Sequence, residues 1–116
     1  AIAMNLSAQE LPADINEFEK AGLTMQPSQI VKPPRVMESP IHYECQVVEI
    51  VDLGQEPGSG SVVIGRVVHL HVDDAVMIGE DKIDLAKLQP IGRLAGASYT
   101  RVTDLFDLVR PPSEVK

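Results

Sequence analysis

Residues 92–99, near the C-terminal end, combine side chains that suit phosphate binding. Gly92 and Gly96 would let a ligand approach the backbone closely, because glycine has no Cβ atom. Arg93 and Ser98 can donate hydrogen bonds to a phosphate, and Tyr99 adds a flat ring and a hydroxyl group. Glycine and serine are also frequent in ordinary turns, so the segment taken alone fits a plain loop better than a binding site.

His69, His71 and Asp73 alternate along one segment, and a strand would turn all three side chains to the same face. Three such side chains could bind zinc or iron if the imidazoles converged on the ion. The sequence shows no further ligand cluster, and alternating polar residues are typical of a half-exposed strand. We therefore expect the exposed face of a strand here, and no metal site.

The sequence gives little support for nucleophilic or acid–base catalysis. Cys45 is the only cysteine, and it lies in an alternating apolar segment without a helix N-terminus or a basic motif to activate it. We expect a buried thiol there and no intrachain disulfide. Asp73 and Asp74 are adjacent, so on a strand they point to opposite faces and cannot readily share one proton.

Two β-rich segments predict a long hairpin. In residues 41–53 the odd-numbered side chains from Ile41 to Val47 form the face expected to be buried, and the even-numbered ones form the exposed face. Residues 61–72 are rich in β-branched side chains, and the Gly- and Ser-rich residues 54–60 suit the turn. Gly65 interrupts the second strand, as at bulges that bend barrel strands, so the pattern favours a barrel.

Helices should be few and short. Residues 1–6 have the character of a helix interior. Residues 14–21 predict a helix with Asp14 and Glu17 at capping-box spacing and a left-handed stop at Gly22.

The remaining segments predict short or irregular elements. Residues 23–40 contain four prolines, which remove backbone donors, and therefore predict a loop or an edge strand. Residues 75–79 predict a short strand, and residues 83–89 predict one helical turn that ends before Pro90.

Composition places the chain among single-domain globular proteins. Of its 116 residues, 44% are hydrophobic but only 3% are aromatic, so the core must be aliphatic. The net charge of −7 and the lack of a basic run argue against binding to nucleic acid. No segment reaches the ~20 apolar residues of a membrane span, and no signal peptide is recognisable. A single cysteine fits a cytoplasmic location.

The order of the motifs resembles the flavin reductase-like family, whose members bind FMN in a split β-barrel. Residues 62–74 (VVIGRVVHLHVDD), 82–102 (KIDLAKLQPIGRLAGASYTRV) and 104–111 (DLFDLVRP) look like the C-terminal portion of that family. Residues 4–24 (MNLSAQELPADINEFEKAGLT) and 31–50 (VKPPRVMESPIHYECQVVEI) resemble its central helix, proline-rich crossing and following strand. The resemblance covers nearly the whole chain.

This resemblance implies a mainly β, partial split barrel with one or two short helices, paired as a homodimer with FMN in a groove near the interface. Hydride would pass from NADH or NADPH to FMN, and then to an acceptor or a partner monooxygenase. Arg93 is implied as a donor to the FMN phosphate, with Tyr99 near the flavin and Ser98 assisting. Asn5 and Ser7 match small polar positions that would line the pocket.

The family's first strands have no counterpart in this sequence. We therefore expect residues 1–116 to be the C-terminal portion of one flavin reductase-like domain, with the N-terminal barrel strands absent from this chain. Such a chain exposes strand edges that invite another strand. The N-terminal part of the same domain, or a second chain, would complete the barrel and the oxidoreductase.

Two alternatives stand beside the oxidoreductase. A related branch of reductases has a Gly-Asp-His triplet before the long hairpin strand, and the matching residues here are Gly58, Ser59 and Gly60. Without that imidazole the chain also fits a noncatalytic flavin-binding or storage protein. The other alternative is a small β-rich interaction or metal-binding module that uses His69 and His71.

Overall fold

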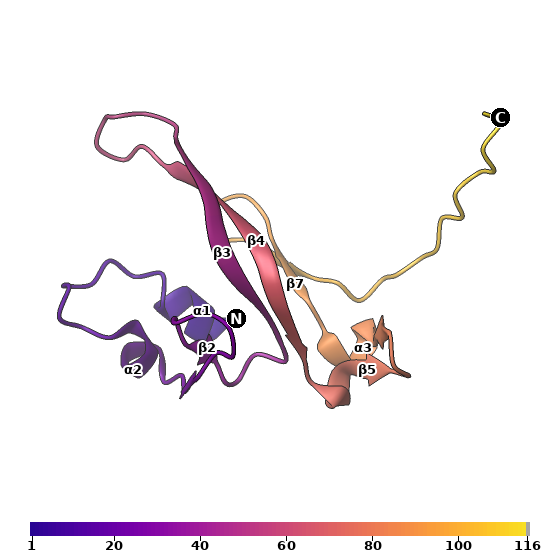
Figure 1. Ribbon diagram of the computed structural model, residues 1–116, viewed down its shortest axis with the longest axis horizontal. Helices are drawn as coiled ribbons and strands as arrows, with labels where there is room; N and C mark the ends of the chain where they lie inside the picture. Colours follow the sequence, from indigo (N-terminus) through magenta and orange to yellow (C-terminus); the bar gives the residue numbers. More distant parts are fainter. Residues whose placement is uncertain (116) are drawn as a thin grey trace.

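The computed structural model describes residues 1–115 and shows a mainly β chain with short helices (Figure 1). The elements follow in the order α1 (Ile2–Leu6), α2 (Glu17–Ala21), β1 (Met25–Gln26), β2 (Arg35–Val36), β3 (Ile41–Asp52), β4 (Ser61–Val72), the 3-10 helix η1 (Asp74–Val76), β5 (Met77–Ile78), β6 (Lys82–Ile83), α3 (Leu85–Leu88), β7 (Ile91–Arg93) and β8 (Tyr99–Arg101). The strands form four antiparallel pairs: β1–β2, β3–β4, β5–β6 and β7–β8.

The β3–β4 hairpin is the longest element, and it confirms the two predicted strands and the turn between them. Its register shifts between Glu44 and Cys45 and again between Val47 and Glu49, which bends and twists the ladder. Gly65 lies opposite Val47 beside the second shift, as expected of a bulge glycine. A Cβ atom on Gly65 would lie 3.2 Å from the Cβ of Cys45, so the two strands approach closely there.

The assignment of faces on β3 was wrong. Glu44, expected to be exposed, is only 2% exposed, whereas Tyr43 and Val47 are 65% and 63% exposed. Cys45, expected to be buried, is also exposed. The reason is that the loop before β2 folds over Glu44, while none of the described residues packs on the opposite face enough to cover it.

The helix α2 begins later than predicted. Asn16, not Asp14, is the N-cap, because its backbone is extended and its side-chain oxygen accepts a hydrogen bond from the Phe18 N–H at 3.0 Å. The predicted stop at Gly22 is confirmed, with φ at 66° in the left-handed region. The helical residues near the N-terminus and the single turn before Pro90 are also confirmed, as α1 and α3.

The strand predicted over residues 75–79 forms only in part. Asp73 accepts a hydrogen bond from the Ala75 N–H at 2.9 Å and so starts the 3-10 turn η1 instead. The strand β5 is limited to Met77–Ile78. In residues 23–40, the short pair β1–β2 and the proline-rich loop between its strands match the predicted edge structure.

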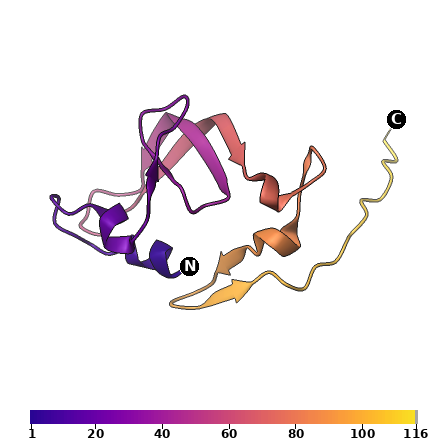
Figure 2. The same cartoon turned by 90° about the horizontal axis from the view of Figure 1, so that it is seen from below.

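The elements follow one another in an open arrangement, and the last residues extend away from the rest of the chain (Figure 2). The radius of gyration is 18.2 Å, against about 13 Å for a compact domain of ~100 residues. Among the described residues, Val76 is the one apolar side chain that is buried. Within residues 1–115, the strands therefore stay as separate pairs and do not close into a barrel.

Candidate functional site

The β7–β8 hairpin brings together three of the predicted site residues. Arg93 lies directly opposite Tyr99, and its guanidinium carbon is 5.9 Å from the centre of the Tyr99 ring. This distance suits a cation–π contact, which is worth about 0.5–1 kcal/mol at an exposed site. The pair places a positive charge and an aromatic face side by side.

The turn of this hairpin is short and well bonded. The Leu94 N–H donates to the Ser98 carbonyl at 2.9 Å, and the Ser98 N–H donates to the Ala95 carbonyl at 3.2 Å. Gly96 has φ at 62°, a conformation that glycine adopts without a steric cost. Ser98 therefore follows the turn directly, next to Tyr99, with its side chain exposed.

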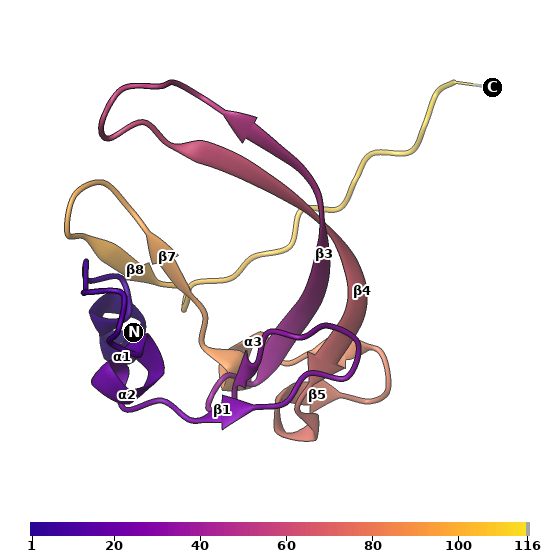
Figure 3. The ribbon, with the colours of Figure 1, turned by 60° about the vertical axis from the view of Figure 1, so that its left-hand side comes forward.

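Asn5 and Ser7 lie apart from that hairpin, on and just after α1. The Ser7 hydroxyl donates to the Met4 carbonyl at 2.9 Å, and Ser7 lines a hollow of about 430 Å³ together with Leu23 and Val36. The Asn5 side chain is exposed. The helix lies on the same side of the molecule as the β7–β8 hairpin (Figure 3). The structure thus groups Arg93, Ser98 and Tyr99, and leaves Asn5 and Ser7 on a neighbouring element.

Glu44 is the centre of a second cluster, which sequence reasoning missed. Its carboxylate accepts hydrogen bonds from the backbone N–H groups of Gln29, Ile30 and Val31 at 2.8, 2.7 and 3.1 Å. It also lies 2.5 Å from Nε2 of His71. One buried carboxylate thereby ties the proline-rich loop to the long hairpin near its open end.

The folded chain favours the ionised form of the Glu44 carboxyl group over the protonated form. Burial alone raises the pKa of its carboxyl group, but the Gln29 N–H, the His71 side chain and the other two N–H donors outweigh burial and hold the pKa at about 2. The only signal in the sequence was an acidic residue in one predicted strand and the histidines His69 and His71 in the next; the register that places Glu44 opposite His69 and within reach of His71 is known only from the structure. The alternation pattern pointed to the exposed face instead.

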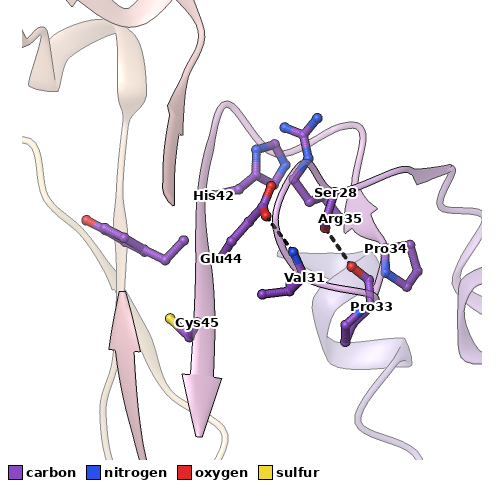
Figure 4. Close-up of a pocket in the computed structure, with 9 residues that line it drawn as sticks. Ser28, Val31, Pro33, Pro34, Arg35, His42, Glu44 and Cys45 are labelled. Atoms are coloured by element: carbon purple, nitrogen blue, oxygen red, sulfur yellow. Dashed lines mark hydrogen bonds between the residues drawn. The ribbon is translucent and has the colours of Figure 1, made fainter. Parts of the chain in front are cut away.

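A hollow of about 350 Å³ lies beside Glu44, between β3 and the proline-rich loop (Figure 4). Ser28, Arg35 and His42 contribute its polar groups. Each is bonded within the chain: Ser28 donates to the Pro33 carbonyl at 2.6 Å, Arg35 donates to the Pro27 carbonyl from two of its nitrogens, both at 3.3 Å, and His42 Nε2 lies 2.6 Å from the Val36 carbonyl. The polar groups that line the hollow therefore hold the proline-rich loop in place.

Comparison with known protein families shows to which family the chain belongs. Residues 1–83 match the family described as flavin reductase like domain. The chain belongs to that family.

Relatives of this flavin reductase-like chain occur in several bacteria. An uncharacterized protein of Halalkalibacterium halodurans is 40% identical over 111 residues, which is 94% of this chain and 53% of that protein. YwrF of Bacillus subtilis is 31% identical over 111 residues, which is 93% of this chain and 54% of YwrF. The chain therefore spans about half the length of the curated relatives it matches.

Solved structures agree on the fold of the flavin reductase-like chain. Nitrilotriacetate monooxygenase component B from Bacillus cereus matches with a TM-score of 0.81 and 35% identity, over 91% of this chain and 53% of that one. The 2-nitrobenzoate 2-nitroreductase of Pseudomonas fluorescens matches with a TM-score of 0.80 and 30% identity, over 97% and 56%.

A Shewanella frigidimarina protein assigned as a flavin reductase with a split barrel domain matches with a TM-score of 0.79 and 26% identity, over 94% of this chain and 54% of that one. The predicted family and the predicted mainly β, split-barrel fold class are confirmed by these matches. In the described part of the flavin reductase-like chain, four strand pairs belong to that architecture and do not close it.

The histidines of the flavin reductase-like chain do not form a metal site with Asp73. His71 is bound to Glu44, the rings of His69 and His71 lie edge to face with centres 4.4 Å apart, and Asp73 caps η1. Within residues 1–115, no group of three His, Cys, Asp or Glu side chains has the geometry to hold an ion. None of the helices described is long and apolar enough to cross a bilayer.

Proposed function

We propose that this chain is part of an FMN-binding oxidoreductase, in which the β7–β8 hairpin holds the phosphate end of the cofactor. Family membership supports a flavin protein, and the Arg93–Tyr99 pair is the observation that favours FMN. When bound, FMN would supply the hydride chemistry, so the protein needs only to bind and orient it. Its electron donor would be NADH or NADPH.

The residues of the hairpin fit such a ligand. Arg93 forms no ion pair with any carboxylate of residues 1–115, so its guanidinium is free to bind a phosphate in the forked geometry that arginine favours. Tyr99 offers a ring face and a hydroxyl group beside it. The exposed Ser98 hydroxyl is the nearest further donor along the chain, and Asn5 and Ser7 would approach from α1.

In the proposed enzyme, the split barrel is completed by further strands that precede β1 in the sequence. The sheet faces support this: Val47, Ile50 and Val63 are 63%, 58% and 60% exposed, which leaves apolar surface for another layer. The relatives are about twice as long as the chain, which leaves room for those strands. We call this chain together with the completing strands the complete protein, and propose that it is a cytoplasmic homodimer.

The electron acceptor of the proposed enzyme is a small molecule or a partner monooxygenase. The Bacillus cereus neighbour is component B of nitrilotriacetate monooxygenase, which favours a partner enzyme. The Pseudomonas fluorescens neighbour is a nitroreductase, which favours a small acceptor. A storage role is the second candidate, because residues 58–60 at the hairpin turn are Gly-Ser-Gly and include no imidazole.

One experiment tests the proposal and separates the two roles. The complete protein is titrated with FMN, its absorbance spectrum is recorded, and the bound flavin is mixed with NADH or NADPH in a stopped-flow instrument. Bound flavin that bleaches rapidly supports the oxidoreductase, and bound flavin that stays oxidised supports storage. Protein that leaves the FMN spectrum unchanged throughout the titration would overturn both.

A further inference from the structure

We infer that Arg93 and Arg101 together form a site for a phosphate monoester on one face of the β7–β8 hairpin. The inference rests on the proposed function, because the monoester belongs to a nucleotide that the proposed enzyme uses. The inference goes further than the proposed function because it adds Arg101 as a residue that determines specificity for a phosphate monoester.

The register of the hairpin puts both arginines on one face. Arg93 lies opposite Tyr99, and Ile91 lies opposite Arg101. Residues directly opposite in an antiparallel pair share a face, and so do residues two apart on one strand. Arg93 and Arg101 are therefore diagonal neighbours at about 7–8 Å, which long side chains can bridge to meet on one anion.

The charges of the two arginines are not neutralised within the described chain. The chain has a net charge of −7, yet no carboxylate of residues 1–115 forms an ion pair with either guanidinium. Two neighbouring like charges repel each other, so a bound anion between them would be stabilised by both. The pair is a local positive patch on an acidic protein, which would also attract an anionic ligand.

Space for the rest of a ligand lies beside Arg101. A hollow of about 240 Å³ opens at the base of the hairpin, lined by Gln89, Pro90, Ile91, Arg101, Val102 and Thr103. Its lining combines apolar side chains with an amide, a hydroxyl and the guanidinium. This mixture suits the chain of carbon atoms and hydroxyl groups next to a nucleotide phosphate.

The charge of the ligand follows from the charge of the site. A phosphate monoester has a charge of about −1.5 to −2 near neutral pH, which matches two guanidinium groups. A phosphodiester has a single negative charge for each phosphate and matches the pair less well. Two molecules of the proposed reaction contain a monoester: FMN, in its 5′-phosphate, and NADPH, in its 2′-phosphate.

The test compares each phosphorylated ligand with its unphosphorylated analogue in the complete protein. Dissociation constants are measured for FMN and riboflavin by flavin fluorescence, and kcat/KM is measured for NADPH and NADH. Arg101→Gln should weaken FMN binding, or lower kcat/KM for NADPH, by about 10- to 100-fold, the effect of removing one hydrogen-bonded charge. Riboflavin and NADH should be unaffected. A loss confined to FMN assigns the flavin phosphate, and a loss confined to NADPH assigns the 2′-phosphate.

Controls make the result specific to this site. Arg66→Gln removes an exposed arginine on β4 and should change none of the four values. Arg101→Lys keeps the charge without the forked geometry, so it should give a smaller loss. If Arg101→Gln lowers affinity equally for phosphorylated and unphosphorylated ligands, or for none of them, the inference is overturned.

A second measurement separates this inference from the proposed function. Binding of inorganic phosphate is followed by ³¹P line broadening, which needs no flavin. Broadening that disappears in Arg101→Gln supports the anion site even if the wild-type protein binds neither FMN nor riboflavin. Wild-type protein that binds both flavins but shows the same phosphate broadening as Arg101→Gln supports the function and refutes the site.

Discussion

The Glu44 carboxylate on β3 lies 2.5 Å from Nε2 of His71 on β4, diagonally across the longest ladder of the chain. The same carboxylate accepts hydrogen bonds from Gln29, Ile30 and Val31 in the loop before β2. One side chain therefore joins two strands and a loop 13 to 15 residues earlier in the sequence. Because Glu44 is only 2% exposed, its hydrogen bonds to the loop and to His71 replace the hydrogen bonds that water would make to the carboxylate.

Replacing Glu44 should release the proline-rich loop. In Glu44→Gln the amide can accept from fewer of the three N–H groups, and its own N–H₂ group brings donors to a place crowded with donors. We expect a fall in the melting temperature of several degrees and faster hydrogen exchange at Gln29, Ile30 and Val31. Hydrogen-exchange mass spectrometry of the loop peptide measures the second effect.

Glu49→Gln is the matched control for this variant, because Glu49 lies on the same strand and is exposed. It should leave both the melting temperature and the loop exchange unchanged. Equal exchange of the loop in Glu44→Gln and in the wild type would show that Glu44 does not anchor the loop.

The ionisation of Glu44 predicts how stability depends on pH. The hydrogen bonds lower its pKa from 4.5 to about 2 in the folded chain, so the folded state binds this proton less readily than the unfolded state. The stabilisation is fully present above pH 4.5 and is lost as the pH falls toward 2. Chemical denaturation of the complete protein between pH 6 and 2 should show this loss, and Glu44→Gln should show a shallower slope over the same interval. Parallel slopes for the two proteins would contradict the prediction.

Local patterns were sufficient to predict the elements that are set by local chemistry. The β-branched residues 61–72, the turn at residues 54–60 and the left-handed Gly22 are features of single segments, and each occurs where expected. The pairing of Arg93 with Tyr99 needs only a short turn between short strands, yet no hairpin was predicted over residues 91–101, and the role of both residues in FMN binding stays a prediction.

Two features were predicted wrongly: the exposed face of β3, which depends on a distant segment, and the N-cap of α2, which depends on a local hydrogen bond. Alternation assigned Glu44 to the exposed face and Cys45 to the buried face, because a pattern cannot show which face the loop at residues 27–35 will cover. Asp14 was chosen as a cap from its spacing to Glu17, although Asn16 reaches the Phe18 N–H directly. In each case a hydrogen bond made in the folded chain prevailed over the sequence pattern.

The cap of α2 gives a direct test of that correction. Asn16→Ala removes the oxygen that accepts the Phe18 N–H and should lower the free energy of unfolding by about 1 kcal/mol. Asp14→Ala is the comparison, and it should change the free energy far less because Asp14 makes no capping bond. Urea denaturation of both variants measures the difference, and a larger loss in Asp14→Ala would restore the original assignment.

Tyr99 should contribute to the proposed flavin site through its ring more than through its hydroxyl group. The Arg93 guanidinium lies 5.9 Å from the ring centre, so the ring helps to hold the arginine that would bind the phosphate. Tyr99→Phe keeps that ring and should leave the FMN dissociation constant within about threefold of the wild-type value, since a single exposed hydrogen bond contributes little. Tyr99→Ala should weaken FMN binding by about tenfold or more, because it removes both the ring face and the support of Arg93. Fluorescence titration of the complete protein with FMN measures both variants. Equal affinities in Tyr99→Ala and the wild type would place the flavin away from this hairpin, whereas a large loss in Tyr99→Phe would assign the contact to the phenol instead.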